Sequence, residues 1–197
     1  RNPRFLLELG DALRDESDPA VVLYVTGERL AAHLNVGRVG YGEVSEDGRW
    51  VSAGGRGWAD DAMPGASGSF RLEDFGPEAA AAVRRGELSV VADAAHDPSV
   101  NPDVHRALGI EAAITVPLVR RGRLEALLYV HSTVPRPWRE AEVQLVLDVA
   151  ERTWATLERG RAEERARPAL GGALDAPAQA VPGFPSAEEV ERASGLA

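Results

Sequence analysis

The stretch AAITVPLVRRGRLEALLYVHS, residues 112–132, decides the fold. It predicts two strands, residues 114–119 and 124–131, joined by a tight turn at Arg121-Gly122. Side chains alternate along a strand, and here both faces of the second strand are apolar. One face carries Leu124, Ala126, Leu128 and Val130, and the other carries Leu127 and Tyr129. We therefore expect a central strand of a sheet that is covered on both sides.

Helices are predicted on both sides of this hairpin in the sequence. Residues 5–13 have apolar side chains at helical spacing, and Asp18-Pro19 is a helix-start signal for residues 20–34. The run AVVLYV in that second helix is also compatible with a strand, but its apolar stripe favours a helix. After the hairpin, residues 139–167 are expected to form one long exit helix.

Shorter elements lie between the second helix and the hairpin. Residues 36–44 and 49–53 predict another hairpin, whose Asp47-Gly48 pair suits a type I′ turn. A glycine-rich loop, two short helices and one strand follow, at residues 54–68, 77–85, 102–108 and 88–93 respectively. This order predicts an α+β fold with a central antiparallel sheet of five or six strands. The N-terminal and exit helices should cover one face, and the loops and short helices the other.

The domain is expected to span residues 1–167. Residues 168–197 are rich in Ala, Pro and Gly and predict a linker that adds little stability, with a capping box at Ser186 and Glu189 for a short terminal helix. Because the chain begins at Arg1, we expect it to be part of a longer protein or a processed product.

Composition excludes several kinds of chemistry. The chain has no cysteine and no lysine, which excludes disulfides, thiolate sites, P-loop lysines and Schiff bases. Its formal net charge of −9 disfavours binding to nucleic acid or anionic membranes. No stretch predicts membrane insertion or a signal peptide, so we expect a cytoplasmic protein.

The chain resembles the GAF domain family over about residues 4–167. The resemblance rests on residues 112–132 together with three further stretches, residues 34–48, 72–98 and 143–163, the last being like the exit helix of GAF modules in bacterial sensor histidine kinases. Where many members have a glycine early in the last strand, this chain has Glu125-Ala126. The resemblance implies a sensor domain of a bacterial signalling protein, relaying ligand state to an output domain in the same polypeptide.

In that family the ligand lies between the sheet and the loops that cover one face. Known ligands are cyclic nucleotides, bilins, haem and small metabolites. This chain lacks the cysteine that tethers a bilin, the Asp-Ile-Pro segment of phytochrome pockets, and the family's cyclic-nucleotide motif. The free methionine sulfoxide reductases of this fold act through cysteines. Three hypotheses remain: a sensor of an unknown small molecule, a ligandless module for dimerisation and relay, and an enzyme, for which we find no catalytic residues.

Six residues are predicted to line the ligand pocket: Tyr41, Trp58, Phe70, Asp93, His105 and Tyr129. For each aromatic, a role in the core is an equally good interpretation. Glycines 37, 40 and 42 would let a ligand or loop approach the first strand. A His/Asp cluster at residues 93–105 has no metal-ligand spacing, so no metal is expected.

The exit helix carries two apolar stripes. Leu147, Ala150, Trp154 and Leu157 alternate at spacings of three and four, as in a coiled-coil seam, and are predicted to form a homodimer interface. Leu145 and Val149 are predicted to pack on the domain. If instead Trp154 covers the sheet, its replacement by Glu would unfold the domain and would not merely separate a dimer.

Overall fold

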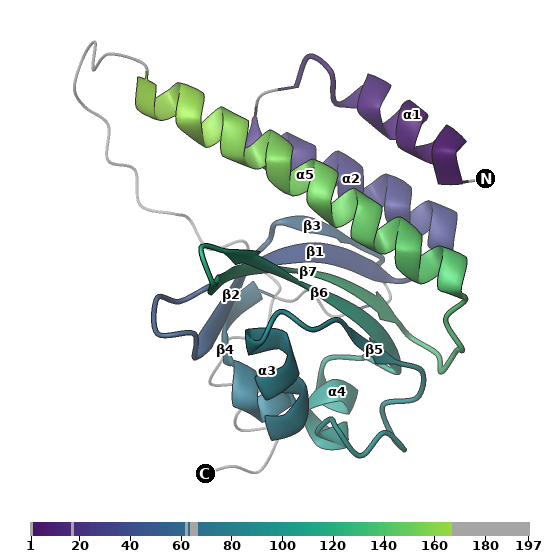
Figure 1. Cartoon of the computed structure of the whole chain (residues 1–197). Coiled ribbons are helices and arrows are strands. Elements are labelled where there is room, and N and C mark those ends of the chain that lie inside the picture. Colours follow the sequence, from purple (N-terminus) through teal and green to yellow (C-terminus); the bar gives the residue numbers. More distant parts are fainter. Residues whose placement is uncertain (1, 17, 62, 64–66, 167–197) are drawn as a thin grey trace.

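A computed structural model describes residues 2–16, 18–61, 63 and 67–166 (Figure 1). The predicted tail at residues 168–197 lies outside them. The helices are α1 (Asn2–Ala12), α2 (Pro19–Leu34), the 3-10 helix η1 (Leu72–Phe75), α3 (Pro77–Arg84), α4 (Pro102–Ala107) and α5 (Glu140–Ala166). The strands are β1 (Arg38–Val44), β2 (Trp50–Gly54), β3 (Gly57–Ala59), β4 (Ser67–Arg71), β5 (Ser89–Val91), β6 (Ala112–Arg120) and β7 (Arg123–Ser132).

The strands form one antiparallel sheet in the order β4-β2-β1-β7-β6-β5, with β3 also paired to β1. The predicted α+β class is confirmed, and β7 is central as expected. The sheet has seven strands, which is more than the five or six predicted. The additional pairing involves β3 and β4, which lie largely in the segment predicted as a glycine-rich loop.

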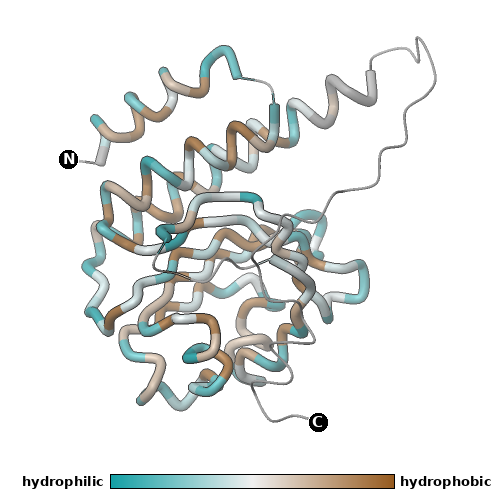
Figure 2. The backbone as a smooth tube through the Cα atoms, turned by 180° about the vertical axis from the view of Figure 1, so that it is seen from behind, coloured by the Kyte–Doolittle hydropathy of each residue, from teal (hydrophilic) through white to brown (hydrophobic). Residues whose placement is uncertain are grey.

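Two layers cover the sheet. Helices α1, α2 and α5 lie over one face, and η1, α3 and α4 lie at the other (Figure 1). Hydrophobic residues run through the sheet and along the helices packed on it (Figure 2). The main core cluster joins α1, α2 and α5 to β1, β6 and β7, whereas two smaller clusters lie under η1, α3 and α4.

Helix α2 forms despite its β-branched start because its first turn is capped. The Asp18 side chain accepts a hydrogen bond from the Ala20 N–H at 2.8 Å, and Pro19 occupies the first turn. The helix then buries one stripe, including Val22, Leu23 and Leu30, against the sheet and α5. The predicted helix is confirmed.

Two turns differ from the prediction in their detail. Asp47 does not have positive φ and only Gly48 does, at 69°, with its N–H bonded to the Ser45 carbonyl. The residues from Ser45 to Trp50 therefore form a four-residue hairpin loop rather than a type I′ turn, so that prediction is wrong. The two positive φ values of a type I′ turn occur instead at Arg121 and Gly122, 51° and 74°.

Leu124 lies on the opposite face from the one predicted. Leu118 pairs with Ala126 and Val119 pairs with Leu124, so Glu125 is an extra residue in β7. This β-bulge reverses the alternation, and Leu124 joins Leu127 in the cluster under α3.

The predicted dimer seam on α5 is directed into the domain. Ala150 and Leu157 are only 0% and 6% exposed, within the main core cluster, and Leu147 and Trp154 pack against the same cluster. Leu145 and Val149 are buried as predicted. Ala150 and Leu157 face inward because α5 is covered by α1 and α2 as well as by the sheet, whereas Leu147 and Trp154 are half-buried. Ala150 and Leu157 therefore cannot meet a partner helix in this fold.

Candidate functional site

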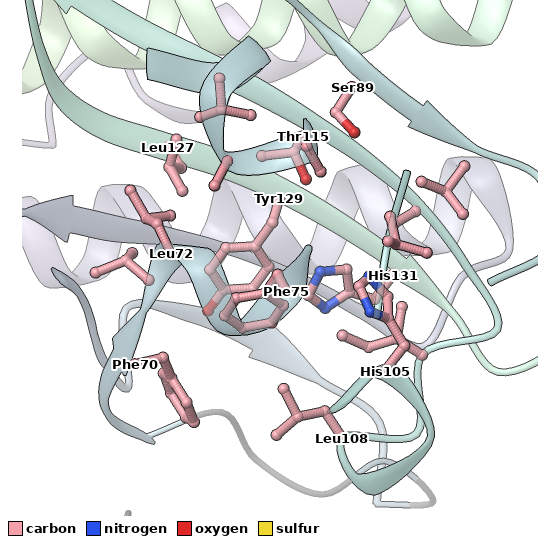
Figure 3. A pocket seen from close by; sticks show the side chains of 18 of the residues that line it. Phe70, Leu72, Phe75, Ser89, His105, Leu108, Thr115, Leu127, Tyr129 and His131 are labelled. Carbon is pink, nitrogen blue, oxygen red and sulfur yellow. The ribbon is translucent and has the colours of Figure 1, made fainter. Parts of the chain in front are cut away.

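A cavity of about 90 Å³ lies between the sheet and the η1–α3–α4 layer (Figure 3). Its walls are mostly apolar side chains from β2, η1, α3, β5 and the segment after α4. Its polar side chains come mainly from β1, β6, β7 and α4. An apolar cavity with a few polar groups has the character of a small-molecule site, although this one is smaller than most ligand pockets.

Strand alternation decides which residues reach the cavity. On β7, Leu127, Tyr129 and His131 face it, whereas Leu128 and Val130 belong to the core under the helices. On β1 the same rule directs Arg38 to the cavity and Val39 to the helices.

Gly40 is required for the position of the Tyr129 ring. The two residues are paired across β1 and β7, and a Cβ on Gly40 would lie 2.4 Å from the Tyr129 hydroxyl oxygen. Without a side chain at residue 40, the tyrosine ring can lie across β1. Gly37 and Gly42 have similar neighbours, Met63 and Val51, so the protein's own side chains occupy the space beside all three glycines.

Arg38 and His131 form a buried polar pair at one corner of the cavity. Arg38 is 2% exposed; its Nε donates to His131 Nδ1 at 3.0 Å, and its Nη2 donates to the Leu108 carbonyl at 3.1 Å. Burial lowers the pKa of Arg38. Burial, followed by the charge of Arg38 and by His105, lowers the pKa of His131 well below its usual value. His131 is therefore neutral at neutral pH.

The two histidines have defined tautomers. His131 Nδ1 accepts from Arg38, so the ring proton is on Nε2. His105 Nδ1 lies 2.8 Å from the Asn101 carbonyl, which can only accept, so Nε2 of His105 carries a lone pair. Burial lowers the pKa of His105 as well. The corner thus presents one imidazole donor and one imidazole acceptor.

Aromatic contacts hold these rings in place. Tyr129 stacks on His131 with ring centroids 4.8 Å apart, and Phe75 meets His105 edge-on at 5.8 Å. Among the residues that the structure describes, the Tyr129 hydroxyl, His131 Nε2 and His105 Nε2 have no hydrogen-bond partner. All three side chains line the cavity. A ligand is therefore offered hydrogen bonds that the protein does not use itself.

The structure brings three of the six predicted pocket residues to the cavity, namely Phe70, His105 and Tyr129. Tyr41 lies on the opposite sheet face, beside Thr153 of α5, because it is one residue out of phase with Gly40. Trp58 pairs with Val39 and packs in the layer under α2.

Asp93 is the third predicted residue that does not line the cavity. It lies at the surface after β5, where it pairs with His96 at 2.9 Å. No group of three or more His, Cys, Asp or Glu that could hold a metal ion occurs within the described parts of the chain.

Sequence reasoning missed Arg38 and His131 as site residues. His131 follows Tyr129 by two positions on the same strand face, so the alternation that selected Tyr129 would also have selected it. Arg38 precedes Gly40 by two positions, but an arginine in a strand is usually exposed, and only the three-dimensional structure shows its burial.

Solved structures with the same fold bind several kinds of molecule. Free methionine-R-sulfoxide reductase from Neisseria meningitidis, solved with its substrate, is 18% identical, with a TM-score of 0.67 over 82% of this chain and 91% of that one. The phycoerythrobilin-bound GAF domain of a cyanobacterial phytochrome is 14% identical, with a TM-score of 0.67 over 83% and 98%. The GAF domain of an Acinetobacter phosphoenolpyruvate-protein phosphotransferase is 13% identical, with a TM-score of 0.63 over 83% and 97%. At these identities the similarity shows the fold alone.

None of the helices among the described residues is long and apolar enough to cross a membrane. No curated protein sequence matches the chain significantly. The family model of the GAF domain matches residues 18–157, from the cap of α2 into α5 and across the whole sheet. This chain belongs to the GAF domain family.

Proposed function

We propose that this GAF domain is a regulatory sensor that binds a small molecule between the sheet and the η1–α3–α4 layer. The observation that supports this is the cavity, in which three polar atoms without a partner in the described chain face a mostly apolar space. None of the three atoms is among the fully buried unpaired atoms of the described residues, so each stays accessible to a ligand that enters this mostly apolar cavity. Two proteins of similar structure were solved with a bound substrate or chromophore.

Signal relay belongs to the same proposal. Strands β1 and β7 carry cavity residues on one face and contact the helix layer on the other, and α5 continues beyond the sheet (Figure 1). A ligand that shifts these strands would move α5 and an output domain attached to it. We also propose that the domain belongs to a bacterial two-component protein, that its role is regulatory and not catalytic, and that it forms a homodimer. The dimer interface does not use Ala150 and Leu157, which are buried.

The competing function is a ligandless relay module. The small volume of the cavity favours it, as do the side chains that fill the space beside the glycines of β1. The two functions make different predictions for ligand binding after a substitution that fills the cavity.

Ala80→Leu tests the proposal. Ala80 is buried on α3 and lines the cavity, whereas its neighbour Ala81 does not, so Ala81→Leu on the same helix is the matched control. A metabolite library of acids, amides, amines and nucleotides is screened by thermal shift and native mass spectrometry. We expect at least one compound to bind the unsubstituted protein and the Ala81→Leu variant, but not Ala80→Leu. If no compound binds the unsubstituted protein, the sensor function is rejected in favour of the relay module.

A further inference from the structure

The polar corner of the cavity favours a ligand that accepts hydrogen bonds. His131 Nε2 is a donor, because Arg38 occupies Nδ1, and the Tyr129 hydroxyl is a second group that can donate. His105 Nε2 is the only one of the three that must accept. Figure 3 shows Tyr129, His131 and His105 gathered in one part of the cavity, next to Phe75.

The charge of the corner favours an anion. Arg38 lines the cavity and hydrogen-bonds directly to His131, so its positive charge polarises the Nε2 N–H toward a ligand. In an apolar cavity the attraction between a guanidinium and an anionic ligand is weakly screened. No Asp or Glu lines the cavity among the described residues, so a carboxylate ligand meets no like charge there.

The remaining walls of the cavity determine the size and polarity of the part of the ligand that is not hydrogen-bonded at the polar corner. They are aliphatic and aromatic, with Phe70, Leu72 and Leu127 among them, which disfavours a second charged group. The cavity volume of about 90 Å³ is below the ~150 Å³ of an engineered cavity that accepts benzene. A short aliphatic chain therefore fits better than an aromatic ring or a nucleotide.

On the basis of the proposed sensor function, we propose that the ligand is a short-chain aliphatic monocarboxylate whose carboxylate is bound by His131 and Tyr129 beside Arg38. The apolar walls hold its hydrocarbon part.

Binding of three isosteric probes tests the ligand class. Isobutyrate, isobutyramide and isobutylamine share the branched body and differ in charge. Calorimetry at matched ionic strength should give the tightest binding for isobutyrate. Equal or tighter binding of the amide or the amine would overturn the carboxylate assignment. Equal binding of inorganic phosphate would overturn the role of the apolar walls.

Tyr129→Phe tests the anchor, with Tyr41→Phe as its matched control. Both substitutions remove one tyrosine hydroxyl from the same sheet, on the cavity face and on the helix face respectively. We expect Tyr129→Phe to weaken isobutyrate binding about tenfold or more, as for a hydrogen bond to a charged group, and Tyr41→Phe to leave it unchanged. Unchanged binding in Tyr129→Phe would overturn the anchor.

The failure of this proposal is distinguishable from failure of the sensor function. If isobutyrate does not bind but another compound does, and Ala80→Leu abolishes that binding, the ligand class is wrong and the sensor function stands. If no compound of any charge binds, the sensor function itself fails.

Discussion

The neutral, buried His131 predicts that the folded domain loses stability in mild acid. Its pKa lies well below the usual value because burial and the charge of Arg38, with a smaller effect of His105, all disfavour the imidazolium. In the unfolded chain the imidazole titrates near its ordinary pKa of about 6.5. Below that pH the unfolded state binds a proton that the folded state does not, so the free energy of unfolding falls as pH falls.

The size of the effect follows from this difference. Between about pH 7.5 and about pH 5.5, one histidine that stays neutral when folded lowers the free energy of unfolding by about 1.4 kcal/mol. His105, whose pKa burial also lowers, adds to this loss. Carboxylates contribute little in this window, because in unfolded chains they titrate near pH 4.

Urea unfolding followed by tryptophan fluorescence at these two pH values measures the loss. His131→Gln should reduce the pH dependence by about 1.4 kcal/mol, whatever it does to stability at neutral pH. Tyr41→Phe is the control, because it alters the other face of the same sheet and removes no histidine, and it should retain the full pH dependence. A His131→Gln protein with the same pH dependence as the unsubstituted protein would refute the inference that His131 is buried in its neutral form.

Three further predictions concern the helix layer. Tyr41→Phe should change the free energy of unfolding by less than about 1 kcal/mol, because the buried Tyr41 hydroxyl interacts only weakly with the Thr153 hydroxyl; thermal denaturation measures this. Glu142→Gln should lower the free energy of unfolding in urea by about 2 kcal/mol, because buried Glu142 accepts from Arg136 at 2.6 Å. Trp154→Glu should lower it by about 2 kcal/mol or more, since Trp154 packs on the core, and a stably folded variant by circular dichroism would contradict this.

The order of most helices and strands could be predicted from the sequence, because strong local signals mark where these elements begin and end. The cap at Asp18, the hairpin turn at Arg121-Gly122 and the two apolar faces of β7 each have one good structural solution. The short strands β3 and β4 lack such signals. β3 has only three residues and β4 is rich in Gly and Ser; they are strands because β1 and β2 offer them backbone partners. That pairing is a tertiary effect, which local propensity does not report.

The candidate site could be predicted only in part from the sequence, and the reason is related. Alternation assigns residues to two faces, but it does not say which face of β1 meets which layer. Tyr41 was therefore assigned to the cavity. The residue at this end of β1 that lines the cavity is Arg38, which lies two positions before Gly40. The error at Leu124 is of the same kind, because a single bulged residue at Glu125 reverses the face of everything before it. On the α5 stripe predicted as a dimer seam, Ala150 and Leu157 are buried because α1 and α2 widen the buried arc of that helix, and Leu147 and Trp154 stay half-buried.

The two faces of β1 connect the cavity to the helices. Arg38 is bonded to His131 and to the Leu108 carbonyl on the cavity side, while the adjacent Val39 is buried in the core beneath α2. Three residues after Arg38 on the same strand, the buried Tyr41 hydroxyl lies beside the Thr153 hydroxyl of α5 and interacts with it weakly. A ligand that pulls on His131 acts on Arg38, because the two residues are paired directly across β7 and β1. Packed cores change between discrete arrangements and do not deform smoothly, so this contact between β1 and α5 ties the position of the helix to that of the strand.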